Sequence, residues 1–253
     1  MTELLATAAT AASLESTTRD TLLRGRVTVF QPTRGYRFSL DPVLLSGFVS
    51  QPYGRFVDLG AGCGVLSFLL LARDSRAIAT AVEIQPGLAE LASQGALENG
   101  ITSRFTLVPG DFLVWAGSQS RCAFDLVASN PPFYQVDGGH ISPVRQRALA
   151  HHEIALALTD WTAASARLLT PQGRFAVVFP AERRDALLVA LAAQGFRDVR
   201  VRLVRTKADR PAHRVLVEAC RGGARVRTEP DLVVHHGAEF SPEVKSYLGE
   251  DAS

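Results

Sequence analysis

The chain has 253 residues, of which 47% are hydrophobic and 21% charged, and its formal net charge is +2. A chain of this length buries enough apolar surface for one large domain, and this composition is typical of a globular enzyme. No apolar run reaches the roughly 18 residues that span a bilayer, which argues against a membrane protein. The first residues also lack the basic start and apolar stretch of a secretory signal, so we expect a cytoplasmic protein.

Cysteine and histidine positions bear on metal binding. The three cysteines lie far apart and form no CxxC pair, which argues against a zinc site and against a disulfide framework. His151-His152-Glu153 are adjacent, so they cannot all face one ion on a helix. His235-His236 is a pair near the end of the chain, where an edge strand or tail is the simpler interpretation. We therefore predict no metal site.

Basic residues are unevenly distributed. Residues 197–227 contain ten Lys or Arg against three Asp or Glu, and residues 19–37 contain five Arg against one Asp. Such segregation favours a polyanionic partner such as nucleic acid. The alternative is an ordinary solvated surface in an arginine-rich protein, because 25 of the 27 basic residues are arginine.

From residue 55 onward, short apolar runs alternate with helical patterns. We predict strands over residues 55–58, 77–83, 105–108, 124–129, 174–179, 199–205 and 214–219, and helices over 65–72, 87–98, 154–169 and 182–193, with a short segment around Trp115. This alternation indicates an α/β fold with a doubly wound, mostly parallel seven-stranded sheet. The last two strands are joined by a loop too short for a crossover helix, so one strand should be antiparallel.

A further helix is predicted ahead of the first strand. Asp41 is expected to be its N-cap and Pro42 its first helical residue, followed by an apolar run. Residues 31–40 before it are polar and aromatic, which suits a segment lying over the mouth of a pocket.

Residues 57–64 read VDLGAGCG and lie between a predicted strand and a predicted helix. Gly60, Gly62 and Gly64 allow the backbone to turn tightly and to approach a ligand closely. Their G-x-G-x-G spacing differs from the G-x-G-x-x-G of dinucleotide-binding enzymes. Glu83 lies at the end of the next strand, where a carboxylate can accept hydrogen bonds from both ribose hydroxyls of a nucleoside.

The next candidate is Asp111, which lies between Gly110 and Phe112 directly after the third strand. A carboxylate there can accept a hydrogen bond from the adenine amine of a cofactor, with Phe112 against the ring. Because Gly-Asp is a common turn pair, this assignment depends on its position after the glycine loop and Glu83.

The most specific motif is Asn130-Pro131-Pro132-Phe133, at the end of the fourth strand. Its prolines fix the backbone, so that a carbonyl oxygen and the Asn130 amide oxygen can face one ligand. Two acceptors suit a planar –NH2 group, either adenine N6 or a glutamine amide. Accepting both hydrogens localises the nitrogen lone pair for attack on a methyl group, while Phe133 stacks on the planar group. Such catalysis depends on positioning and electrostatics.

With these elements in order, the chain resembles the class I S-adenosylmethionine-dependent methyltransferases that carry a D/N-P-P-Y/F motif. Residues 31–45, 82–86 and 130–133 are similar to motifs of the bacterial tRNA(Val) adenine-N6 methyltransferases, which modify the adenine beside the anticodon. The resemblance implies S-adenosyl-L-methionine as the cofactor and RNA, specifically tRNA, as the partner. Two departures are Phe133, where Tyr is commoner, and His151-His152-Glu153, which is typical of only part of the family.

The resemblance also implies three sets of site residues. The catalytic set is Asn130, Pro131, Pro132 and Phe133. The cofactor-binding set is Asp58, Gly60, Gly62, Gly64, Glu83, Ile84, Asp111 and Phe112. The substrate-binding set is Arg34, Tyr36, Arg37, Asp41, Arg145 and Arg147. We divide the chain into a flexible arm over residues 1–18, a methyltransferase domain over 19–225 and a C-terminal extension over 226–253.

Two other functions remain open. The same motif would serve a protein glutamine N5-methyltransferase of the release-factor type. Those enzymes usually carry a separate N-terminal helical domain, whereas only 40 residues precede Asp41 here. A non-catalytic RNA-binding protein would show a degenerate cofactor site, whereas Asp58, Glu83 and Asp111 are all present, as is Asn130. The sequence therefore favours methylation of adenine N6 in RNA.

Overall fold

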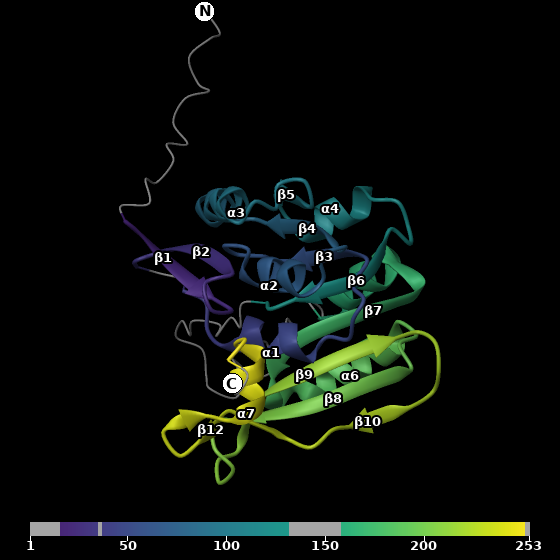
Figure 1. The fold of residues 1–253 in the computed structure, drawn as a ribbon. Helices are drawn as coiled ribbons and strands as arrows, with labels where there is room; N and C mark the ends of the chain where they lie inside the picture. Colours follow the sequence, from purple (N-terminus) through teal and green to yellow (C-terminus); the bar gives the residue numbers. More distant parts are fainter. Residues whose placement is uncertain (1–15, 35–36, 132–157, 251–253) are drawn as a thin grey trace, which may run out of the picture.

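The computed structural model describes residues 16–34, 37–131 and 158–250. Its centre is a nine-stranded sheet in the order β10-β8-β9-β7-β6-β3-β4-β5, with β11 also paired to β8 (Figure 1). The strands of this sheet are β3 (Arg55–Leu59), β4 (Ile78–Glu83), β5 (Phe105–Pro109), β6 (Phe124–Ser129), β7 (Leu169–Pro180), β8 (Asp198–Arg205), β9 (Ala212–Cys220), β10 (Val226–Thr228) and β11 (Leu232–Val233). The helices are α1 (Asp41–Phe48), α2 (Val65–Arg73), α3 (Pro86–Glu98), α4 (Phe112–Ser118), a helix over residues 158–168, the short 3-10 helix η1 (Ala181–Arg183), α6 (Arg184–Ala193) and α7 (Pro242–Tyr247).

The strand directions confirm the predicted mostly parallel sheet. β9 runs antiparallel to β7 and β8, and every other pair in this sheet is parallel. The predicted strands correspond to β3 through β9, and the expected number of seven is too small because β10 and β11 extend the sheet along β8. These two strands contain three and two residues, too few to show an apolar alternation in the sequence.

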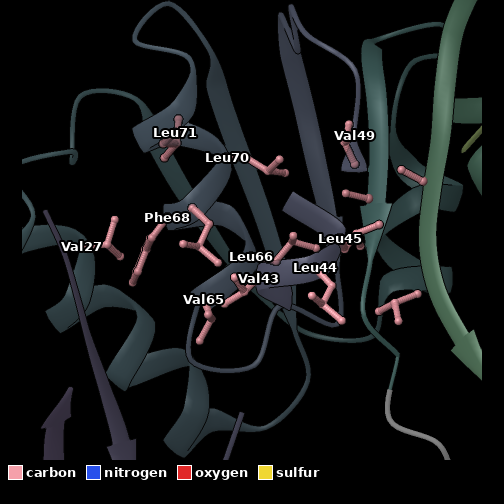
Figure 2. Close-up of a cluster of buried hydrophobic side chains, with 14 of the residues drawn as sticks. Val27, Val43, Leu44, Leu45, Val49, Val65, Leu66, Phe68, Leu70 and Leu71 are labelled. Atoms are coloured by element: carbon pink, nitrogen blue, oxygen red, sulfur yellow. The ribbon is translucent and has the colours of Figure 1, made fainter. Parts of the chain in front are cut away.

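Helices cover both faces of the sheet. One buried cluster joins the sheet to α1, α2 and α3, and Figure 2 shows 14 of its side chains. The other joins it to α4, the 158–168 helix and α6. Neighbouring residues of β3 divide between them, with Phe56 in the first cluster and Val57 in the second, because successive side chains of a strand point to opposite faces. A strand buried on both faces explains the nearly continuous apolar runs of the sequence.

The ring of Phe68 in α2 packs against two glycines. A Cβ on Gly64, before α2, would lie 2.7 Å from this ring, and one on Gly95, in α3, would lie 2.5 Å from it. Gly64 also has a φ of +84°, which L side chains rarely adopt. The start of α2 is thereby held close to α3 by one buried side chain.

A β-hairpin precedes the sheet and was not predicted. It consists of β1 (Thr17–Leu22) and β2 (Val27–Pro32), which pair antiparallel. Asn99, at the end of α3, exchanges two hydrogen bonds of 2.7 Å with the backbone of Thr28, so the hairpin lies against that helix (Figure 1). The hairpin turn places Leu23 and Arg24 at positive φ, and neither residue type marks such a turn in a sequence.

The predicted N-cap of α1 was wrong. Leu40 is the N-cap, and Asp41 is the first residue of the helix with no capping hydrogen bond from its side chain. The Asp41 carboxylate instead accepts a hydrogen bond of 3.0 Å from Nε of Arg214 in β9, which joins α1 to the sheet. In the part of the chain that the structure describes, no helix is long and apolar enough to cross a membrane.

Candidate active site

Four parallel strands end at the same edge of the sheet, and the predicted site residues follow them. β3 ends at Leu59, β4 at Glu83, β5 at Pro109 and β6 at Ser129. The chain adds β4 and β5 on one side of β3 and β6 on the other, so the strand order reverses beside β3. Open α/β sheets bind ligands at this kind of carboxyl edge. The fold therefore brings the glycine loop, Glu83, Asp111 and Asn130 to one edge.

The glycine loop after β3 has the backbone conformation that its sequence predicts. Gly60, Gly62 and Gly64 have φ values of +74°, +58° and +84°. The backbone amides of Gly60 and Ala61 donate to the carbonyl of Val82 at 2.9 and 3.0 Å, which ties the loop to β4. A Cβ on Gly60 would have no atom within 4 Å, so open space lies above the loop at this glycine.

Glu83 is 4% exposed and holds the loop against the end of β4. Its Oε2 accepts a hydrogen bond of 2.7 Å from the amide of Gly62, and its Oε1 accepts one of 2.8 Å from the amide of Gln85. A carboxylate has about four lone-pair sites, so each oxygen keeps capacity for another donor. This arrangement fits a carboxylate that is held in place to accept ribose hydroxyls.

Asp111 caps α4 and lies next to exposed apolar groups. Its Oδ1 accepts hydrogen bonds of 2.7 and 3.2 Å from the amides of Leu113 and Val114. Because both bonds use Oδ1, Oδ2 retains acceptor capacity. Ile84, after β4, is 60% exposed, and Phe112 is half-buried. An exposed Ile beside two carboxylates suits the face of an adenine ring.

Asn130 lines a cavity together with the glycine loop. This cavity is bounded by Phe38, Pro42, Asp58, Gly60, Ala61, Cys63, Val65, Leu66 and Asn130. Ser129 fixes the end of β6, since its hydroxyl donates a 2.6 Å hydrogen bond to the carbonyl of Leu59. The cavity measures about 10 Å³, room for one water, so most of a nucleoside would lie outside it on the open edge. Of residues 31–40, which were expected to lie over the mouth of a pocket, Phe38 lines this cavity.

Asp58 is the most perturbed acid of the site. It is 1% exposed, and burial raises the pKa of its carboxyl to about 7. The hydrogen bonds that Ser67 donates act in the opposite direction and lower this pKa. The hydroxyl of Ser67 donates to Oδ2 at 2.9 Å, and the nearby charge of Glu83 raises the pKa further. Perturbed acids cluster at functional sites. Ser67, one turn into α2, was not identified from the sequence, because a single serine in a helix carries no signal.

The predicted substrate residues are only partly within the described chain. Arg34 is exposed, and Arg37 pairs with Asp20 at 3.4 Å. Asp41 is 7% exposed in its pair with Arg214. Five predicted site residues and the His-His-Glu run lie outside the described residues: Tyr36, Pro132, Phe133, Arg145, Arg147, His151, His152 and Glu153.

A larger cavity of about 620 Å³ lies at the opposite, amino edge of the sheet, and is lined in part by Gly54, Asp125 and Arg174. Its two charged side chains already have partners in the fold. Asp125 accepts a hydrogen bond of 2.9 Å from the amide of Arg55, and Arg174 pairs with Glu218 at 3.5 Å. The predicted site residues Asp58, Gly60 and Asn130 line the smaller cavity at the carboxyl edge instead.

Half of the basic residues in the segment 197–227 are neutralised within the fold. All residues of this segment are described, and five of its ten Lys and Arg pair with carboxylates: Arg200, Arg202, Arg205, Arg214 and Arg227. The local charge excess therefore overstates the positive surface that this segment offers to a polyanion.

The chain is similar to known methyltransferases. Residues 41–201 match the methyltransferase small domain family. A tRNA1(Val) (adenine(37)-N6)-methyltransferase from Porphyromonas gingivalis is 31% identical over 221 residues, which cover 82% of this chain and 85% of that protein. The chain belongs to the tRNA1(Val) adenine-N6 methyltransferase family. The family predicted from the motifs is thereby confirmed.

Solved structures agree with the fold of the family. A predicted O-methyltransferase from Agrobacterium tumefaciens has a TM-score of 0.67 at 21% identity, covering 84% of this chain and 98% of that one. TYW2 of M. jannaschii, solved in complex with AdoMet, has a TM-score of 0.55 at 14% identity, covering 81% and 85%. At these identities the similarity shows that the chain has a methyltransferase fold. It does not identify the substrate.

Proposed function

We propose that this methyltransferase transfers a methyl group from S-adenosyl-L-methionine to N6 of an adenine in RNA, and that the substrate is the adenine next to the anticodon of valine tRNA. The observation that carries the proposal is that Asn130, at the end of β6, lines one cavity with Gly60 and Asp58 of the cofactor loop. The activity named for the P. gingivalis relative supports the choice of adenine over glutamine.

The described residues fit S-adenosylmethionine. The open space over Gly60 lets the cofactor approach the protein backbone closely. Glu83 has remaining acceptor capacity for the ribose hydroxyls of the cofactor. Exposed Ile84 and half-buried Phe112 provide apolar surface for the adenine ring, with Asp111 to accept from its amine. When bound, this cofactor supplies an electrophilic methyl group.

Asn130 and Pro131 act on the target amine. The Asn130 amide oxygen and a backbone carbonyl of the motif accept the two hydrogens of the planar –NH2 group, which localises its lone pair on nitrogen. The amine becomes acidic only as the new N–C bond forms, so the excess proton leaves to water without a strong base. The Ser129 bond to Leu59 fixes this acceptor beside the cofactor loop. Such fixed acceptors act chiefly through positioning and electrostatics.

Substitution of Asn130 tests this role. We expect Asn130→Ala to lower kcat on the order of 10²- to 10³-fold, the effect typical of removing one preorganised polar group. The affinity for S-adenosylmethionine, measured by calorimetry, should stay within about twofold of wild type, since the affinity depends on Glu83 and the glycine loop. Asn130→Asp keeps an acceptor oxygen at the same position and should retain more activity than the alanine variant.

The substrate is tested with labelled cofactor. Wild-type enzyme is incubated with total bacterial tRNA and, separately, with a ribosome-free protein extract. We expect label in the tRNA, and nucleoside mass spectrometry should identify it as N6-methyladenosine. Label in the protein fraction would instead support the glutamine reaction, and near-normal turnover of Asn130→Ala would contradict the role of this residue.

A further inference from the structure

The loop between β8 and β9 lies at the same edge of the sheet as the candidate active site. β8 is parallel to β10, and β9 is antiparallel to β7, so β8 has the direction of β7, β6 and β3. The carboxyl end of β8 therefore meets the edge where β3 and β6 end. Residues 206–211 of the loop are all exposed at that edge.

The loop is joined to the active-site cavity by a short series of contacts. Pro42 lines the cavity with Asn130. The preceding residue, Asp41, pairs with Arg214, three residues beyond the end of the loop. The Asp41–Arg214 pair therefore joins the start of α1, which lines the cavity, to β9 close to the loop.

Two basic side chains of this loop remain available to a partner. Arg205, Arg214 and the other paired arginines of residues 197–227 are held by carboxylates. In contrast, Lys207 and Arg210 are exposed and form no ion pair with the described residues. The loop also contains exposed Asp209, so it is not uniformly basic. Its positive charges are those of Lys207 and Arg210.

The fold holds this loop in one shape. The amide of Arg210 donates to the carbonyl of Lys207 at 3.0 Å, which closes a turn. Nη1 of Arg205 donates to the carbonyl of Arg210 at 2.7 Å, while its Nε contacts Asp231. A preformed loop loses less conformational entropy when it binds a partner.

A second hairpin, made of β12 (His235–His236) and β13 (Glu239–Phe240), extends the surface of the loop. The amide of His235 donates to the carbonyl of Thr206 at 3.0 Å, so the two segments lie side by side (Figure 1). The ring of His235 stacks on Phe240 with centroids 4.9 Å apart and planes 20° from parallel. His236 next to this stack is exposed. The hairpin therefore adds polar, ring-bearing surface to the two cations.

We infer that residues 206–211 and 235–240, here named the loop–hairpin surface, bind the phosphate backbone of the RNA substrate while the target adenine lies on the open carboxyl edge of the sheet beside Asn130. The inference rests on the proposed function, since it assumes an RNA substrate. Lys207 and Arg210 contact phosphates, which set the position of the RNA without reading its sequence. The partner chemistry is a polyanion beside the cavity, which a glutamine-bearing protein would not supply.

The test compares two double variants that remove equal charge from the same basic segment. Lys207→Ala/Arg210→Ala removes the two cations at the carboxyl edge. Arg197→Ala/Arg225→Ala removes two exposed cations at the amino edge, next to the start of β8. The side chains of all four residues are exposed, so both variants should fold, and thermal unfolding checks this. The probe is a transcript of a bacterial valine tRNA, titrated by fluorescence anisotropy at several salt concentrations.

We expect the loop variant to bind tRNA on the order of tenfold more weakly at 0.1 M salt, and its log–log salt slope to be shallower by about 1.5 to 2, which corresponds to two lost phosphate contacts. The amino-edge variant should bind within about twofold of wild type, because its charges lie beyond a Debye length of roughly 10 Å from the RNA. In turnover, the loop variant should raise KM for tRNA and keep kcat and the affinity for S-adenosylmethionine.

The outcomes separate this inference from the proposed function. If wild type methylates tRNA and the loop variant binds it as tightly as wild type, the loop–hairpin surface does not bind RNA and the proposed function stands. Equal weakening of both variants would mean a diffuse charge effect, which also overturns the inference. If wild type neither binds nor methylates tRNA, the proposed function fails and the inference fails with it.

Discussion

Asp58 should make the stability of the folded protein depend on pH. Its carboxyl is fully buried, and its pKa is raised from 3.8 to about 7, chiefly by burial. A raised folded-state pKa means that the folded protein binds this proton more tightly than the unfolded chain. The resulting stabilisation is fully present below pH 3.8 and is lost as the pH rises through 7. Between pH 5 and pH 8 the loss amounts to about 2.5 kcal/mol of the free energy of unfolding.

Asp58→Asn tests this magnitude, because the amide has the size of the carboxyl and does not titrate. Urea unfolding is measured without cofactor at pH 5, 6, 7 and 8. From pH 5 to pH 8, the free energy of unfolding of wild type should fall by about 2.5 kcal/mol more than that of the variant. Asp209→Asn, at an exposed loop position, serves as the control and should follow wild type. If wild type and Asp58→Asn differ by the same free energy at every pH, Asp58 does not titrate in this window and the reasoning is refuted.

Two further predictions concern the cofactor loop. Gly64→Ala should lower the free energy of unfolding by about 2 to 4 kcal/mol in urea denaturation, because it combines a φ of +84° with a Cβ 2.7 Å from the Phe68 ring. Gly117→Ala in α4 meets no atom within 4 Å and should be neutral or slightly stabilising, and an equal loss at both positions would contradict this argument. Glu83→Gln should weaken S-adenosylmethionine binding on the order of 10- to 100-fold in calorimetry, because the new –NH2 group faces an amide donor such as that of Gly62. Binding within twofold of wild type would exclude Glu83 as a cofactor ligand.

The fold and the cofactor side of the site could be predicted because local patterns specify them. The strands β3 to β6 are short, mostly apolar runs, and a polar or glycine signal follows each of them. Glu83 and Asp111 could be placed at one edge from strand direction alone. Asn130 follows the same logic, and the structure places it in one cavity with the glycine loop.

The remaining features depend on contacts between distant residues. Arg214 and Asp41 are 173 residues apart, and Arg202 pairs with Glu243 across 41. A count of charge along the chain cannot detect such pairing, so the basic segment 197–227 suggested a more positive surface than the fold presents. The N-terminal hairpin was missed for a different reason. β1 has no fully buried residue, so no core pattern marks it, and of the three turn residues at positive φ only Gly25 is of a type that signals a turn.

The contact of Phe68 with Gly64 and Gly95 limits how sequences of this fold can vary. The two glycines are required for different reasons. Gly64 has a positive φ, whereas at Gly95 only the Phe68 ring leaves no room for a side chain. A homologue with a smaller residue at position 68 could accept alanine at 95 and would still need glycine at 64. Substitutions at 68 and 95 should therefore compensate one another, while position 64 stays fixed whatever its neighbours are.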